Sequence, residues 1–174
     1  FRGGYSSVEE VVIHDSSIRL NDEYTYNYCT IGGGTNGSFG SIDIQNSQIH
    51  IPSSGGNTAI GNGWQVYYNR ESRIRIANSE VSVRCASLGP AIGAAWDSGS
   101  GRINIIIENS TVTAKGGNLR TDGNYVPGIG KNALGRAPEI GIQILNSTVD
   151  SFRLTEREGT DYVYDDLQTK ELPG

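Results

Sequence analysis

The sequence has few of the features that mark membrane-spanning, metal-binding or nucleic-acid-binding proteins. Of its 174 residues only 36% are hydrophobic, and no apolar stretch approaches the ~20 residues that a membrane-spanning helix needs. Histidine and cysteine occur twice each, and no Cys/His cluster has the spacing of a zinc site. The formal net charge is −5 without any basic run, so nucleic acid is not an expected partner.

Chemistry-bearing motifs are also scarce. His14 and His50 fall at different positions of the repeats described below, which favours solvated strand positions over a catalytic or ligand role. The calcium-binding glycine-aspartate repeat of calcium-loaded coils does not occur. We therefore expect no cofactor and no metal, although a single calcium at aspartates or backbone carbonyls stays open.

What the chain does contain is a ten-residue sequence motif that occurs five times. In residues 42–51 two short alternating runs of isoleucine flank an Asn-Ser pair, and the pattern indicates two half-buried strands joined at a corner. Corner residues follow one another at spacings of 31, 32, 31 and 37: Asp15, Asn46, Asn78, Asn109 and Asn146. A period of this length is typical of an array of stacked units.

A second phrase keeps the same period and supplies a third strand to each unit. It places a glycine after an isoleucine at Gly32, Gly61, Gly93 and Gly130, where we expect a tight corner with positive φ. Such short strands have no local partner, so their hydrogen bonds must go to the equivalent strands one unit away. The chain is therefore predicted to be all-β, a right-handed parallel β-helix of about five turns with an asparagine ladder at one corner.

The repeat also suggests how the chain is divided. Residues 1–153 are expected to form the coil, with 1–10 covering its first turn, and the charged residues 154–174 to form a cap or linker tail. Cys29 and Cys85 lie two turns apart, roughly 9–10 Å of rise by the strand spacing, which is too far for a disulfide. We predict two free, buried thiols.

Two tryptophans occupy the same position of neighbouring units. Trp64 follows Ile60 by four residues and Trp96 follows Ile92 by four, so the coil should stack the two indoles in one column. Flat aromatic faces beside carboxylates and amides suit a sugar ring, whereas the alternative is that the pair plugs a corner. The candidate ligand-binding residues are Trp64, Tyr67, Tyr68, Trp96, Asp97 and Tyr125.

A glycosidase reading needs two carboxylates facing each other across a sugar. Asp97, Glu108 and Asp122 lie in units three and four and are the candidates for that alternative, but nothing in the sequence sets any pair at the required separation. On the outer face of the first strands we expect Asp43 beside Arg75, and an unexpectedly apolar surface at Ile106 and Leu145.

The Ile-x-Ile-x-Asn-Ser-x-Val phrase joined to Ala-Ile-Gly-x-Gly resembles the pectate-lyase-like right-handed parallel β-helix superfamily. More closely, it is similar to the glycine-rich AIGxG repeats of large secreted and cell-wall proteins of gut bacteria. The resemblance covers roughly residues 10–150 and implies a fold shared by polysaccharide lyases, glycoside hydrolases, phage tailspikes and non-catalytic carbohydrate-binding or adhesive modules. No catalytic motif of the lyases can be carried onto this chain.

Three functions follow as hypotheses. The first is a secreted or cell-surface, non-catalytic module, such as part of an adhesin, that contacts carbohydrate or a surface partner. The second is a fragment of a β-helix glycoside hydrolase or polysaccharide lyase, and the third a structural spacer joined to neighbouring domains. Because the chain has no methionine and begins at Phe1, we expect a mature or excised part of a larger bacterial protein.

Overall fold

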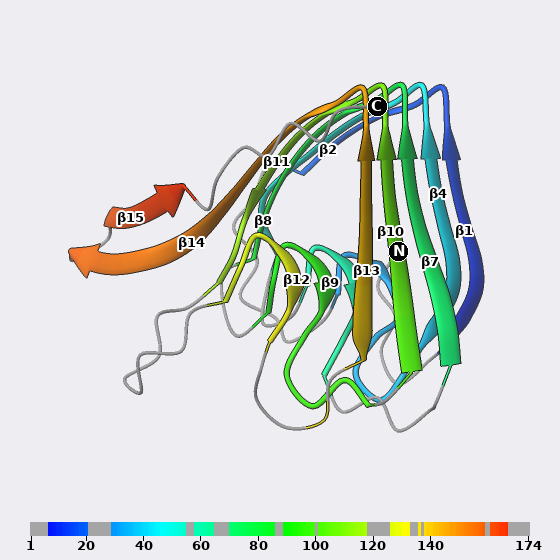
Figure 1. Cartoon of the computed structure of the whole chain (residues 1–174), viewed down its shortest axis with the longest axis horizontal. Coiled ribbons are helices and arrows are strands. Elements are labelled where there is room, and N and C mark those ends of the chain that lie inside the picture. Colours follow the sequence, from blue (N-terminus) through cyan, green and yellow to red (C-terminus); the bar gives the residue numbers. More distant parts are fainter. Residues whose placement is uncertain are drawn as a thin grey trace.

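The protein is a parallel β-helix of about five turns, as the repeat predicted (Figure 1). In the computed structural model equivalent strands of successive turns pair in parallel to form three sheets; two of the sheets contain a strand from each of five turns and the third contains a strand from four, and no helix occurs among the described residues. The structure describes residues 7–20, 29–54, 58–64, 70–85, 89–99, 101–117, 126–132, 136, 138–158 and 161–166.

Sheet A contains the first strand of every turn. Its members, in spatial order, are β1 (Val8–His14), β4 (Phe39–Gln45), β7 (Arg70–Ala77), β10 (Gly101–Glu108) and β13 (Glu139–Leu145). Sheet B follows the asparagine corner and contains β2 (Ser17–Arg19), β5 (Gln48–Ser54), β8 (Glu80–Cys85), β11 (Thr111–Lys115), β14 (Thr148–Glu158) and β15 (Asp161–Asp166). Sheet C is the narrowest, with β3 (Ile31–Gly32), β6 (Ile60–Asn62), β9 (Ile92–Ala94) and β12 (Ile129–Lys131).

The core is built from columns of identical or similar side chains, one per turn. Ile42, Ile74 and Ile105 pair in register along sheet A, and none of the three exposes any surface. Between them on each strand lie outward positions, so that Asp43 stands beside Arg75 as predicted. Alternation of inward isoleucine with outward polar residues thus produces both the strand and its stacking register.

The glycines of sheet C let successive turns approach closely. We call Gly32, Gly61, Gly93 and Gly130 the glycine column; their φ angles are 130°, 136°, 130° and 140°. A Cβ atom on Gly93 would lie 1.9 Å from the carbonyl oxygen of Gly130 in the next turn. The positive φ was predicted, but the glycines lie within the short strands of sheet C rather than after them.

Both cysteines are free and buried, as predicted. Cys29 exposes 1% of its surface, and its thiol approaches the carbonyl oxygens of Ile31 (3.1 Å) and Gly61 (3.3 Å). Removal from water raises the pKa of the Cys29 thiol to about 11.

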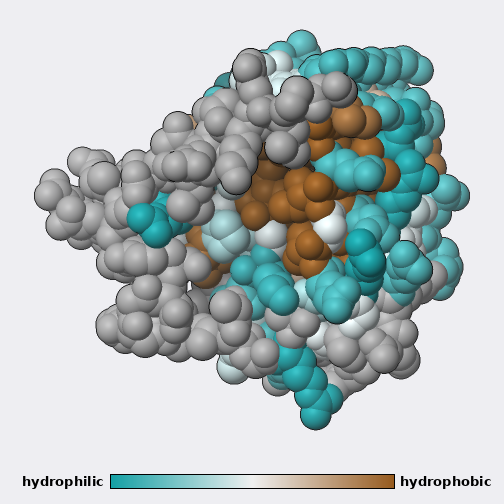
Figure 2. Space-filling model, viewed as in Figure 1, coloured by the Kyte–Doolittle hydropathy of each residue, from teal (hydrophilic) through white to brown (hydrophobic). Residues whose placement is uncertain are grey.

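The two ends of the coil differ. β15 pairs antiparallel with β14, the only antiparallel pairing among the described strands. Figure 1 shows this pair projecting from the body of the coil. In the same view hydrophobic side chains of the described residues gather beside β13 and β12, with hydrophilic side chains next to them (Figure 2).

Candidate functional site

The corner between sheets A and B is held by a column of serines. We call Ser16, Ser47, Ser79, Ser110 and Ser147 the serine column. The backbone N–H of each of the first four donates to the Oγ atom of the serine one turn later, at 3.0–3.1 Å. Each Oγ in turn donates to the carbonyl oxygen two residues earlier, at 2.6–2.7 Å. The column therefore joins all five turns through one continuous set of hydrogen bonds.

The residues just before the serines point outward from the same corner. This asparagine column consists of Asp15, Asn46, Asn78, Asn109 and Asn146, with φ between 47° and 50°, and all five are exposed. Asparagine and aspartate tolerate the left-handed region better than other side chains do. Asn46 Nδ2 donates to Asp15 Oδ1 at 3.1 Å, which is the first rung of the predicted ladder.

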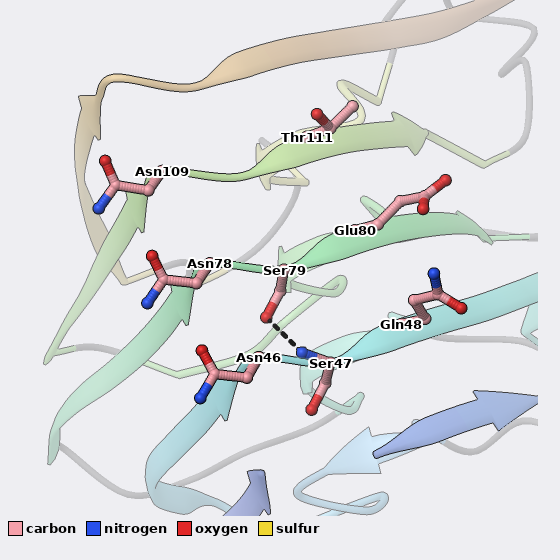
Figure 3. Close-up of a pocket in the computed structure, with 8 residues that line it drawn as sticks. All are labelled: Asn46, Ser47, Gln48, Asn78, Ser79, Glu80, Asn109 and Thr111. Carbon is pink, nitrogen blue, oxygen red and sulfur yellow. Dashed lines mark hydrogen bonds between the residues drawn. The ribbon is translucent and has the colours of Figure 1, made fainter. Parts of the chain in front are cut away.

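A shallow groove of about 450 Å³ lies along this corner (Figure 3). Figure 3 shows the asparagines on one side, the first residues of the sheet B strands on the other, and the serines between them. Its lining is Asn46, Ser47, Gln48, Asn78, Ser79, Glu80, Asn109 and Thr111. Three successive turns thus present an asparagine amide to solvent at the strand spacing, with the Glu80 carboxylate and the Thr111 hydroxyl beside them, whereas Ser47 and Ser79 are buried at the floor of the groove.

A second depression of about 200 Å³ continues from the groove onto the outer face of sheet B. Gln48 and Glu80 line both hollows. The second also has Arg19 and His50 in its lining. Together the two hollows form a polar surface across the first turns of sheet B, one that adds a cation and an imidazole to the groups of the corner groove.

Beside the corner, on the outer face of sheet A, four turns are joined by charged side chains. Asp43 Oδ2 accepts a hydrogen bond from Gln45 Nε2 at 2.7 Å and lies 3.2 Å from His14 Nε2. Arg75 reaches Asp43 Oδ1 at 3.4 Å with one nitrogen and pairs with Glu108 through the other. Partial burial opposes ionisation of Asp43, but these hydrogen bonds and positive charges outweigh it and lower the carboxyl pKa.

The two tryptophans stack, as their equivalent positions predicted. Their ring centroids lie 5.5 Å apart with 16° between the planes, and both side chains are half-buried. The Trp64 Nε1 atom is buried and has no hydrogen-bond partner. Each ring therefore uses one face against the other, and any sugar would have to meet an outer face or an edge of the pair.

Two of the three carboxylates of the glycosidase hypothesis, Asp97 and Glu108, lie among the described residues, in different parts of the same turn. Asp97 lies in the turn before β10, with φ 52°, and its Oδ1 accepts a hydrogen bond from the Arg136 backbone N–H at 3.2 Å. Glu108 is the last residue of the same strand and is paired with Arg75. β10 begins after Asp97, and seven of its residues precede Glu108, a span of about 23 Å at the strand rise. Asp122, Tyr67, Tyr68 and Tyr125 lie outside the described residues.

Among the described residues, no group of three or more His, Cys, Asp or Glu side chains is placed to hold a metal ion. The described part of the chain also contains no helix of the length and apolarity needed to cross a membrane.

Comparison of the chain with protein-family models, with curated proteins and with solved structures gave no match.

Sequence reasoning identified the corner and its asparagine column but missed the serine column that joins the turns beside it. It singled out the asparagines and treated the following serine only as part of the turn. The available signal was that serine follows the corner residue in all five units, although serine is common in turns. The groove itself was missed because it depends on which side chains flank the corner, which only the register between turns reveals.

Proposed function

We propose that this chain is a non-catalytic module, secreted or displayed at a cell surface, that contacts carbohydrate through the groove of the asparagine corner. The observation that carries the proposal is the lining of this groove, where exposed asparagine amides of three successive turns face solvent, with the Gln48 amide and the Thr111 hydroxyl beside them. The resemblance of the repeats to AIGxG proteins of gut bacteria, and through them to carbohydrate-active β-helices, supports the same class of ligand.

The chemistry of the lining favours a hydroxyl-rich, uncharged ligand. Amides and hydroxyls both donate and accept hydrogen bonds, which matches the dual character of sugar hydroxyl groups. Glu80 is the one ionisable group of this lining, which contains no cation that would attract phosphate or sulfate. Because the groups repeat once per turn, roughly every 4.8 Å along the coil, an extended glycan lying along the coil axis fits better than a compact sugar.

The tryptophan pair is the second place where a sugar could bind. Its rings are half-buried and already stacked on each other, so it offers less free aromatic face than the repeat alone suggested. The enzyme alternative has no comparable support, since Asp97 lies before the start of β10 and Glu108 at its end. Neighbouring domains of a larger protein remain expected partners of either kind of module.

A glycan array probed with the wild-type chain tests the proposal, followed by titration of the best glycan against variants. Gln48→Ala and Glu80→Ala remove exposed groove side chains, and each is expected to weaken binding about tenfold, the loss of roughly one hydrogen bond. Arg73→Ala, exposed on the outer face of sheet A, is the matched control and should bind like wild type. Circular dichroism confirms that each variant keeps its fold.

Trp64→Ala and Trp96→Ala complete the set. Binding lost in these two but retained in the groove variants would move the site to the tryptophan pair. If no glycan binds the wild-type chain, the carbohydrate proposal is wrong, and a structural spacer becomes the better hypothesis.

A further inference from the structure

The inward column of sheet A is closed at its first turn and open at its last. Its members Val11, Ile42, Ile74 and Ile105 expose 9%, 0%, 0% and 0% of their surface, whereas Ile142 exposes 43%. Ile142 pairs in register with the fully buried Ile105, so it belongs to the core column, and no strand of the described residues stacks on its other side. A core surface has been left facing solvent.

The strand that carries this surface is an edge strand. Among the described strands β13 has β10 as its one neighbour in sheet A, so the backbone groups along its other side pair with none of these strands. Sheet B differs at the same end, because β15 pairs with β14 there. Leu145, at the end of β13, is 44% exposed, and Figure 2 shows hydrophobic side chains gathered beside this strand. An accessible apolar edge strand is a template for pairing with another chain.

The pattern of β13 decides what fits this edge. Ile140, Ile142 and Ile144 stand at alternate positions and all pair with buried isoleucines of β10. The apolar row is symmetric about Ile142, so two copies of β13 running antiparallel set Ile140 of each opposite Ile144 of the other. Such an isologous contact needs no complementary surface beyond the strand itself.

The other end of the coil does not offer a matching surface. Val11 and Ile13, the inward residues of β1, are both buried, so a head-to-tail arrangement would set the open end of one copy against an end already covered. We therefore propose that two copies of this chain pair tail to tail, through antiparallel β13 strands about a two-fold axis at Ile142. Each core is then extended by three isoleucines of the other copy.

Sedimentation velocity over a concentration series tests the proposal. The wild-type chain is expected to approach twice its 18.7 kDa mass as concentration rises. Ile142→Lys places a charge on the two-fold axis and should hold the chain at the monomer mass. Val12→Lys is the matched control, because Val12 is a β-branched residue, 52% exposed, on the edge strand at the other end of the same sheet. It should dimerise like wild type.

Cross-linking tests the geometry without depending on a disruptive charge. Directly opposed residues of antiparallel strands have Cα atoms about 4.5–5.5 Å apart, within the range that a disulfide bridges. Ile142→Cys should therefore form a covalent dimer on mild oxidation, and Val12→Cys should not. Cys29 and Cys85 are buried and should not compete.

Each remaining outcome overturns the proposal. A wild-type chain that stays monomeric at every concentration has no such interface. Dissociation by Val12→Lys, or a dimer that persists in Ile142→Lys, would place the contact elsewhere. The same holds if the wild-type chain dimerises but the Ile142→Cys variant fails to cross-link.

Discussion

The asparagine column and the glycine column both turn the chain with positive φ, but they differ in exposure and in how closely successive turns approach each other. Asparagines at φ near 49° stand outward and exposed, while the serines beside them fasten the turns from within. Glycines at φ 130–140° are buried, and three of the four lie against the backbone of the next turn. The first arrangement leaves side chains free to meet a ligand, whereas the second has no room for any side chain.

The comparison also separates two sources of order between turns. At the asparagine corner, successive turns are held in register by hydrogen bonds of one serine Oγ atom per turn. In the glycine column it comes from close backbone contact. Recognition is therefore expected at the first corner, and sensitivity to mutation at the second.

Alanine in the glycine column should have the largest effect. In Gly93→Ala the new Cβ would lie 1.9 Å from the Gly130 carbonyl oxygen, and alanine would also be strained at φ 130°. We expect a loss of more than about 4 kcal/mol in the free energy of unfolding, or failure to fold. Urea unfolding followed by circular dichroism measures it.

Gly130→Ala is the control that separates the two causes. Its φ of 140° is just as strained for alanine, but the nearest atom to its Cβ is Pro127 Cγ at 3.2 Å. Backbone strain at this φ alone should lower the free energy of unfolding by about 1–3 kcal/mol. Equal losses in the two variants would show that φ strain, rather than contact between turns, explains the requirement for glycine.

Removing one hydroxyl from the middle of the serine column should have an intermediate effect. Ser79 Oγ accepts from the buried Ser47 N–H and donates to the Ala77 carbonyl oxygen. Ser79→Ala leaves both groups without these bonds, so we expect a loss of about 1–3 kcal/mol. The measurement is again the midpoint of urea unfolding.

Ser16→Ala removes the hydroxyl at the first turn, where Ser16 Oγ donates to the His14 carbonyl oxygen at a partly exposed position. Since it leaves no buried N–H of an earlier serine without an acceptor, it should cost less than Ser79→Ala. A loss as large as that of Ser79→Ala would mean that the serines act individually and not as a continuous column.

These columns explain why sequence reasoning succeeded for the fold. Every turn of the coil repeats the same local structure, so Asn46 and Gly61 each have equivalents in neighbouring turns. The sequence period alone is enough to place these equivalents in register. The same logic predicted the stacking of Trp64 on Trp96 and the pairing of Asp43 with Arg75.

Two kinds of feature could not be predicted in this way: those at the ends of the coil, and contacts between residues at non-equivalent positions of neighbouring strands. Nothing in the repeat indicates that β15 returns antiparallel, because residues 161–166 have no counterpart in earlier turns. His14 and Glu108 stand at a different position of their strands from Asp43 and Arg75, so register alone did not connect them. The exposure of Ile142 depends on what covers the last turn, and the repeat pattern carries no information about this.

The smallest expected effect concerns the charged side chains on the outer face of sheet A, beside the asparagine corner. Because the Asp43 pKa is lowered in the folded state, the unfolded state binds more protons in acid, and the stabilisation is fully present above the unperturbed pKa of 3.8. It should disappear as the pH falls through the folded pKa. We expect Asp43→Asn to lose at most about 1 kcal/mol at pH 7, the usual range for surface pairs.

The test is urea unfolding of wild type and Asp43→Asn from pH 7 down to pH 2, with the two curves converging at the acid end. Glu10→Gln, an exposed carboxylate of β1 outside the network, is the control and should run closer to wild type throughout. A constant gap between Asp43→Asn and wild type would mean that Asp43 stabilises the corner by packing alone. The charged side chains of sheet A would then be incidental to the order of the turns, and the serine column would be left as the main polar link at this corner.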